Sequence, residues 1–116
     1  MQDIGNAVYS RYARIINETD NCHKYSGIEW YHLFNVRERQ FTELLRTQGY
    51  VLLNDVYESL GLSRVQEYDN VGWLYNEENP VGDNFIEFGI SNLVYLVNDV
   101  FDYILIDFNV DGVIRY

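Results

Sequence analysis

The rest of the chain is expected to be arranged around Val71–Ile90, VGWLYNEENPVGDNFIEFGI. Large apolar side chains alternate in Val71–Tyr75, and Phe85–Ile90 forms a second apolar run. Residues 76–84 between them are polar and include a proline and a glycine. That composition is typical of a loop, because proline fixes φ and glycine permits positive φ. The sequence therefore predicts that the two runs pair as an antiparallel hairpin, completed by a further strand or a covering helix.

Helices are expected before this hairpin. Apolar residues at helical spacing predict an amphipathic helix over residues 3–17. A longer helix is predicted over Gly27–Gln48, because Ser26 followed by Glu29 forms a capping-box pattern and Gly49 stands where a glycine commonly ends a helix.

Shorter elements are expected between this helix and the hairpin. Tyr50–Leu53 is predicted as a strand. Asn54 is predicted as the N-cap of a short helix over Asp55–Leu60 that ends at Gly61. Ser63–Asn70 has no clear period and is interpreted as a helical turn that leads into the hairpin.

A short helix and a last strand are expected after the hairpin. Ser91 is predicted to cap the helix, and Tyr103–Val110 is predicted as the strand, followed by a turn at Asp111-Gly112. The apolar side of the helix is expected to carry Val94, Val97, Val100 and Phe101. Together these elements predict a single α+β domain over residues 1–116. In it, N-terminal helices precede a three- or four-stranded antiparallel sheet, with a short helix before the last strand.

The composition is that of a globular chain. Hydrophobic residues make up 47% and aromatic residues 16%, which excludes a disordered protein. The single cysteine, Cys22, excludes an internal disulfide and fits a reducing compartment. No apolar run approaches the ~20 residues of a membrane span, and the N-terminus lacks the apolar region of a secretion signal. A cytoplasmic protein without membrane contact is therefore expected.

The net charge of −10 belongs to the second half of the chain. Residues 1–50 carry six acids and six bases, whereas residues 51–116 carry twelve acids against only Arg64 and Arg115. Such a field repels nucleic acid and attracts basic surfaces, so direct nucleic-acid binding is not expected. The alternative is that the charge serves solubility alone.

Three blocks in order carry a resemblance to known sequences: GYVLLNDVYESLGL (Gly49–Leu62), VGWLYNEENPVGDNFIEFGI (Val71–Ile90) and ILIDFNVDGVI (Ile104–Ile114). They resemble a family of uncharacterised proteins encoded by phages and prophages of Gram-positive bacteria. The resemblance implies no activity and no catalytic residues. It implies a mobile-element setting, in which small accessory proteins are often structural parts or inhibitors of host defence.

Two patterns suggest metal sites, and each has a simpler interpretation. Asp107–Gly112, DFNVDG, matches the first six positions of a calcium loop, but the bidentate glutamate of position twelve would fall beyond Tyr116. A strand followed by a turn is expected there instead. Cys22, His23 and His32 fit no zinc spacing, so no metal or cofactor is expected.

No constellation of catalytic residues stands out, and a non-enzymatic protein is expected. Phosphate-binding glycine patterns are absent, and no set of nucleophile, base and orienting residue is evident. On the long predicted helix, Arg37, Arg39 and Arg46 alternate with Glu38 and Glu43, which is typical of a solvated face with mixed charges.

The remaining constellation is a set of acids interleaved with aromatic residues in the second half. Dense acidic charge beside aromatic anchors is the pattern expected of a protein that imitates DNA. The candidate partner-binding residues are Asp55, Glu58, Glu67, Asp69, Tyr68, Tyr75, Glu77, Glu78, Asp83 and Glu87.

The functional hypothesis is a mobile-element interaction protein that binds a basic host protein surface. A nucleic-acid-binding defence nuclease is the candidate partner, with the chain acting as an anti-CRISPR or anti-restriction inhibitor. The alternative is a phage structural or assembly module that binds another phage protein. The sequence does not determine the oligomeric state.

Overall fold

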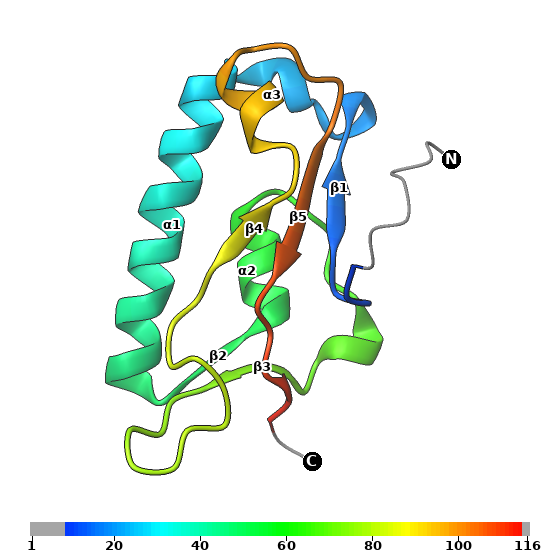
Figure 1. Cartoon of the computed structure of the whole chain (residues 1–116). Helices are drawn as coiled ribbons and strands as arrows, with labels where there is room; N and C mark the ends of the chain where they lie inside the picture. Colours follow the sequence, from blue (N-terminus) through cyan, green and yellow to red (C-terminus); the bar gives the residue numbers. More distant parts are fainter. Residues whose placement is uncertain (1–8, 115–116) are drawn as a thin grey trace.

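The longest element is α1 (Gly27–Gln48), which runs along one side of the molecule in the computed structural model of residues 9–114 (Figure 1). Both of its predicted ends are confirmed. Ser26 Oγ accepts a hydrogen bond from Glu29 N–H at 3.2 Å, and Glu29 Oε1 accepts one from Ser26 N–H at 2.8 Å. Gly49 follows the helix with a φ of 92°, a conformation that favours glycine. The helix therefore begins and ends at signals that lie next to it in the sequence.

Within residues 9–114, short strands form two antiparallel sheets of three strands each. The strands are β1 (Arg14–Ile16), β2 (Tyr50–Leu52), β3 (Val71–Leu74), β4 (Phe88–Ile90), β5 (Ile104–Phe108) and β6 (Gly112–Val113). The first sheet has the order β1-β5-β4, and the second has the order β2-β3-β6. The α+β class is thus confirmed, with two small sheets in place of one.

Short helices connect the strands. They are η1 (Glu18–Asp20), η2 (Cys22–Lys24), α2 (Leu53–Ser59), η3 (Gln66–Tyr68) and α3 (Leu93–Val97), of which the η elements are 3₁₀ turns. Among the described residues, no helix combines the length and the apolar composition needed to cross a membrane.

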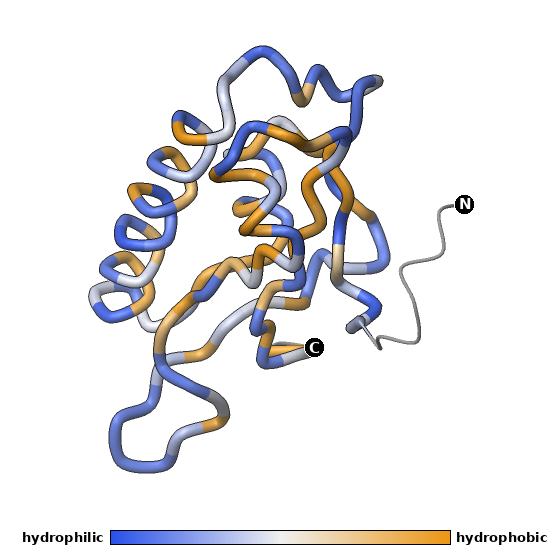
Figure 2. The backbone as a smooth tube through the Cα atoms, turned by 45° about the horizontal axis from the view of Figure 1, so that its top comes forward, coloured by the Kyte–Doolittle hydropathy of each residue, from blue (hydrophilic) through white to orange (hydrophobic). Residues whose placement is uncertain are grey.

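The core lies between the two sheets and the helices α1 and α2. Tyr57 of α2 and Trp73 of β3 are fully buried, and the Tyr57 ring meets the Phe108 ring of β5 edge to face at 5.7 Å. Figure 2 shows the hydrophobic colour concentrated in the centre of the molecule, whereas the connection between β3 and β4 is mostly hydrophilic. The polar connection that was expected as the loop of a hairpin therefore stands away from the core.

The predicted pairing of Val71–Tyr75 with Phe85–Ile90 is wrong. Both runs contain a strand, but β3 pairs with β2 and β6, and β4 pairs with β5. The partners come from distant segments, with Phe88 opposite Phe108 and Val71 opposite Val113. Residues 104–113 thus supply a neighbouring strand to each sheet, which removes the need for β3 and β4 to pair with each other.

The predicted helix over residues 3–17 is wrong where the structure describes it. Residues 3–8 lie outside the described residues, and β1 occupies Arg14–Ile16. Ile16 is 1% exposed and lies opposite Ile104 of β5. Ile16, whose position suggested a helical period, instead packs into the first sheet.

The proposed caps of the two short helices are also wrong. α2 begins at Leu53, and Asn54 lies buried within it. The Asn54 side chain accepts from Val65 N–H at 2.8 Å and donates to Val65 O at 2.9 Å, so it holds the chain after α2. Ser91 does not cap α3, which is preceded by Asn92, and the Asn92 amide bonds the β5 segment instead.

The apolar side expected for the helix after β4 is mostly exposed. Val94 is 68% exposed, Val97 38% and Val100 64%, whereas Leu96 and Phe101 are buried. α3 is one short turn that packs through Leu96 against Gly27, the first residue of α1. The contact is so close that a Cβ at Gly27 would collide with the Leu96 carbonyl. A positive φ at Asp99 then ends the helical spacing before Val100.

Candidate functional site

The candidate acids fall into two groups at opposite ends of β3. Asp55, Glu58, Glu67 and Asp69 lie on α2, η3 and the residue after η3, whereas Glu77, Glu78, Asp83 and Glu87 lie in the connection from β3 to β4. All eight are exposed. In Figure 1 the connection forms a loop that extends from the lower end of the molecule, away from η3. The structure therefore does not join these residues into one surface.

Arg64 lies among the acids of the first group. Its guanidinium lies 2.7 Å from Glu58 Oε1, 3.2 Å from Asp55 Oδ1 and 4.0 Å from Asp69 Oδ1. The hydrogen bonds that Arg64 donates to Glu58 and Asp55 raise its pKa. Asp69 Oδ1 also accepts from the buried Asn54 amide at 2.9 Å. Three of the four acids therefore share a single arginine, whereas Glu67 has no such partner within residues 9–114.

The two candidate tyrosines are packed rather than free. Tyr68 is half-buried, meets the Tyr12 ring edge to face at 5.0 Å and donates from its hydroxyl to Arg11 O at 3.1 Å. Tyr75 is half-buried against the core, and its N–H donates to Gly49 O at 2.9 Å. Tyr68 thereby fastens the segment before β1, and Tyr75 fastens the chain that leaves β3.

The connection between β3 and β4 is closed at its neck by two asparagines. Asn76 N–H donates to Asn84 Oδ1 at 3.1 Å, and Asn84 Nδ2 donates to Asn76 O at 3.1 Å. Asn76 Oδ1 also accepts from the N–H groups of Glu78 and Asn79, at 3.1 and 2.9 Å. Asn84 has a φ of 61°, which asparagine tolerates better than most residues. Residues 76–84, hereafter the acidic loop, are therefore held by their own side chains.

Asn109 ties the returning limb of this loop to both sheets. Its Oδ1 accepts from Trp73 Nε1 at 3.0 Å and from Glu87 N–H at 2.7 Å. Its Nδ2 donates to Phe85 O at 3.0 Å and to Asp83 Oδ2 at 3.1 Å. One side chain thus uses both its donors and its acceptor to fix the loop against the core.

The other polar residues of the calcium-like motif have partners of their own. Asp107 accepts from Ser10 Oγ at 2.7 Å, and Asp111 Oδ2 accepts from Leu74 N–H at 2.9 Å. Burial raises the pKa of Asp111, the Leu74 hydrogen bond lowers it, and the nearby Asp83 raises it. The motif therefore serves the strand and loop structure expected as the simpler interpretation.

The loop acids differ from the Arg64 group in their electrostatic surroundings. Within residues 9–114, no arginine, lysine or histidine forms an ion pair with Glu77, Glu78, Asp83 or Glu87. Asp83 is the one of the four whose carboxylate accepts a hydrogen bond, from Asn109, within that range. The acidic loop thus presents uncompensated negative charge on a backbone of defined shape.

Two hollows lie along α1, one beside Ile86 and the other beside β4. Their volumes are about 410 and 350 Å³, and both are bordered by Asn35 and Glu38. Glu38 is not part of the solvated face expected from the sequence, because Oε2 accepts from Phe88 N–H at 2.6 Å and burial raises the pKa of its carboxyl. Thr42 Oγ1 accepts from Ile86 N–H at 3.0 Å. These two side chains satisfy amide groups along the outer edge of β4.

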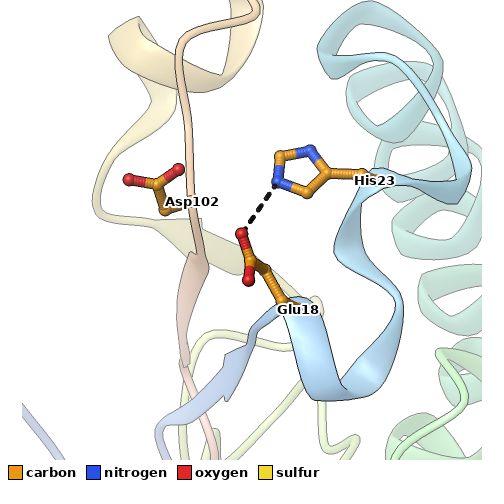
Figure 3. Close-up of side chains that lie close together, drawn as sticks. All are labelled: Glu18, His23 and Asp102. Atoms are coloured by element: carbon orange, nitrogen blue, oxygen red, sulfur yellow. Dashed lines mark ion pairs between the residues drawn. The ribbon is translucent and has the colours of Figure 1, made fainter.

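The structure separates the cysteine and histidines considered for a metal. Cys22 is fully buried and its thiol donates to Asp102 O at 3.5 Å, while His32 is exposed on α1 beside Tyr31. His23 instead lies with Glu18 and Asp102 (Figure 3). Sequence reasoning missed this group because Asp102 is distant in the chain and nothing near it marks the contact.

Comparison with known proteins gives a family without an assigned activity. The model of a family of unknown function, DUF6353, matches residues 9–116, which include the acidic loop and the group around His23. No curated protein and no solved structure shows significant similarity to the chain. On the strength of a match over nearly its whole length, the chain belongs to the DUF6353 family of unknown function.

Proposed function

We propose that the chain is a non-enzymatic interaction protein of a phage or related mobile element that binds a basic protein surface through its acidic loop. The observation that carries the proposal is the uncompensated charge of Glu77, Glu78 and Asp83 on a loop closed by Asn76 and Asn84. A loop already held in one conformation loses less entropy on binding than a disordered one. The loop is therefore a better candidate than the acids that Arg64 already pairs.

The partner class follows from charge complementarity. A surface that binds nucleic acid carries clustered arginine and lysine, which an acidic loop can occupy in place of phosphates. The long-range field of the acidic half also speeds the encounter with such a surface. A nucleic-acid-binding defence nuclease of the host fits this description, which makes the chain an anti-CRISPR or anti-restriction inhibitor in the bacterial cytoplasm.

The second candidate function is a phage structural or assembly module, and the exposed face of α3 favours it. Val94, Tyr95 and Val100 are 68, 62 and 64% exposed and lie close together in the chain. Adjacent exposed aliphatic and aromatic side chains are typical of surfaces that another protein covers. In this function the partner is another phage protein, and the contact is apolar rather than charged.

One capture experiment separates the two functions. The wild type, a Glu77→Lys/Glu78→Lys variant and a Val94→Asp/Val100→Asp variant are used as baits against lysates of host cells with and without phage infection. The proposal expects the wild type and the α3 variant to capture a basic host protein at low salt. It also expects that added DNA competes with the chain for this host protein and that the loop variant does not capture it.

The control for the loop variant is Glu43→Lys, which reverses an exposed acid of α1 that is not among the candidate partner-binding residues. The control should retain capture. Capture of a phage protein that survives the loop substitutions and high salt, but is lost in the α3 variant, would establish the second function and refute the first.

A further inference from the structure

Glu18, His23 and Asp102 place three potential metal ligands at one point of the surface, next to the start of α1 (Figure 3). One ligand atom from each residue lies within 4.8 Å of the other two. Glu18 Oε1 and His23 Nε2 are 3.9 Å apart. The residues come from η1, from η2 and from the residues that lead into β5. The tertiary fold, and not the spacing in the sequence, therefore creates this group.

The backbone beneath Glu18 and His23 is fixed by an unusually complete set of local bonds. Asn17 Oδ1 accepts from Thr19 N–H at 2.9 Å, and Asp20 Oδ2 accepts in return from Asn17 N–H at 3.1 Å. Asn21 has a φ of 62° and turns the chain from η1 into η2. The two exposed ligands are thus carried on a turn of defined shape.

A buried residue joins this turn to the segment that carries Asp102. Cys22 is fully buried between Glu18 and His23 in sequence, and its thiol donates to the backbone carbonyl of Asp102 itself at 3.5 Å. The Cys22 carbonyl accepts from Trp30 Nε1 at 2.6 Å. The His23 ring lies 5.2 Å from the Phe101 ring, centroid to centroid. Packing below the surface therefore holds the three side chains together.

The local charge favours a cation. Within residues 9–114, no lysine or arginine forms an ion pair with Glu18 or Asp102. The basic residue nearest in sequence, Lys24, lies over the Tyr25 ring at 5.1 Å. The carboxylates of Glu18 and Asp102 are therefore free of any lysine or arginine partner among the described residues.

We propose that Glu18, His23 and Asp102 form a binding site for Zn²⁺. One imidazole and two carboxylates are ligands that zinc accepts at ~2.0–2.2 Å, and a fourth position is left for water. Calcium and magnesium prefer sites built from oxygens alone, so the imidazole discriminates against them. All three side chains are exposed, and their ligand atoms already lie within 4.8 Å of one another. The bound ion ties the turn before α1 to the segment before β5.

The test is calorimetric titration of the full-length, tag-free, chelator-treated chain with ZnCl₂. The expected result is one zinc ion per chain and a thermal midpoint that rises with zinc concentration, because a ligand that binds only the native state stabilises it. Glu18→Gln, His23→Ala and Asp102→Asn should each weaken binding by at least about tenfold. Titration with CaCl₂ should give binding at least about tenfold weaker than zinc.

His32→Ala is the matched control, because it removes the other histidine from an exposed position on α1. It should leave zinc affinity unchanged. Circular dichroism of each variant shows whether it is folded, and Asp102→Asn preserves the shape of the side chain. Absence of stoichiometric zinc binding by the wild type, or equal losses in His23→Ala and His32→Ala, would overturn the proposal. Calcium binding as tight as zinc binding would also overturn it.

Discussion

The indole N–H of Trp73 donates to the side-chain oxygen of Asn109 at 3.0 Å and thereby connects the two sheets. Trp73 is fully buried in β3 of the second sheet, and Asn109 directly follows β5 of the first. The same oxygen accepts from Glu87 N–H, which precedes β4. A single polar side chain therefore sets the position of β3, of β5 and of the acidic loop relative to one another.

Asn109→Ala is expected to destabilise the domain by about 2–3 kcal/mol, because it leaves the buried Trp73 N–H without a partner. Urea unfolding followed by tryptophan fluorescence measures the change. The control is Asn98→Ala, whose side chain makes one exposed hydrogen bond to Val94 O. Asn98→Ala should lower the free energy of unfolding by less than about 1 kcal/mol. Equal losses in the two variants would show that the link between the sheets contributes little.

Glu38→Gln should flatten the dependence of stability on pH. Burial raises the pKa of Glu38 in the folded state above its ordinary value of about 4.5, so the native protein binds more protons than the unfolded chain above that pH. Stability from this group is therefore fully present at acid pH and is lost as pH rises through the folded pKa. Glutamine carries no charge and keeps an acceptor for Phe88 N–H.

The measurement is the urea midpoint of wild type and Glu38→Gln from pH 4 to pH 8. The variant should gain stability relative to the wild type as pH rises. Glu43→Gln, an exposed acid on the same helix, serves as the control and should track the wild type. If the urea midpoints of wild type and Glu38→Gln differed by the same amount at pH 4 and at pH 8, the burial argument would be contradicted.

Asn84→Gly tests whether the neck of the acidic loop holds its shape. Glycine tolerates the positive φ at this position, so the substitution removes the two side-chain bonds to Asn76 without adding backbone strain. Amide hydrogen exchange at Asn76, Glu78 and Asn79 should become about tenfold faster. Asn79→Gly lies in the same loop and leaves the Asn76–Asn84 pair in place, so exchange at Asn76 should stay slow. Unchanged exchange in Asn84→Gly would mean that the loop is fixed by other contacts.

Glu77→Lys/Glu78→Lys should slow association with the basic partner while leaving stability within about 0.5 kcal/mol, because exposed loop charges contribute little to folding. Association rates measured by surface plasmon resonance across a salt series provide the readout. The wild-type rate should fall steeply with salt, as steering by exposed charge requires. The association rate of the Glu43→Lys control should fall much less. If the association rate did not depend on salt, or fell equally in both variants, the acidic loop would not be the binding site. The charge would then serve solubility alone.

Local signals predicted α1 and its ends, because the capping box and the terminal glycine act on the residues beside them. They did not predict which strands pair. β3 takes its partners from Tyr50–Leu52 and Gly112–Val113, and nothing within Val71–Ile90 specifies those distant segments. Asn54 was misjudged for a related reason, since it has the chemistry of a cap but its side chain is engaged by the backbone of Val65.

The candidate sites show the same limit. The sequence identified an excess of acids in the second half, but the position of Arg64 among Asp55, Glu58 and Asp69 depends on the turn after α2. The proximity of Asp102 to Glu18 and His23 depends on the packing of Cys22. Tertiary structure therefore decides which charges are compensated and which are available.

The placement of β5 has a consequence for synthesis on the ribosome. β1 and β4 each have β5 as their strand neighbour in the first sheet, and β6 completes the second sheet from the same segment. While residues 104–113 are still inside the exit tunnel, α1 and the β2–β3 pair can form, but β1 and β4 have no strand to join. Co-translational folding of this domain is therefore expected to stop at a partly helical intermediate with open strand edges, and the cooperative step follows the emergence of β5.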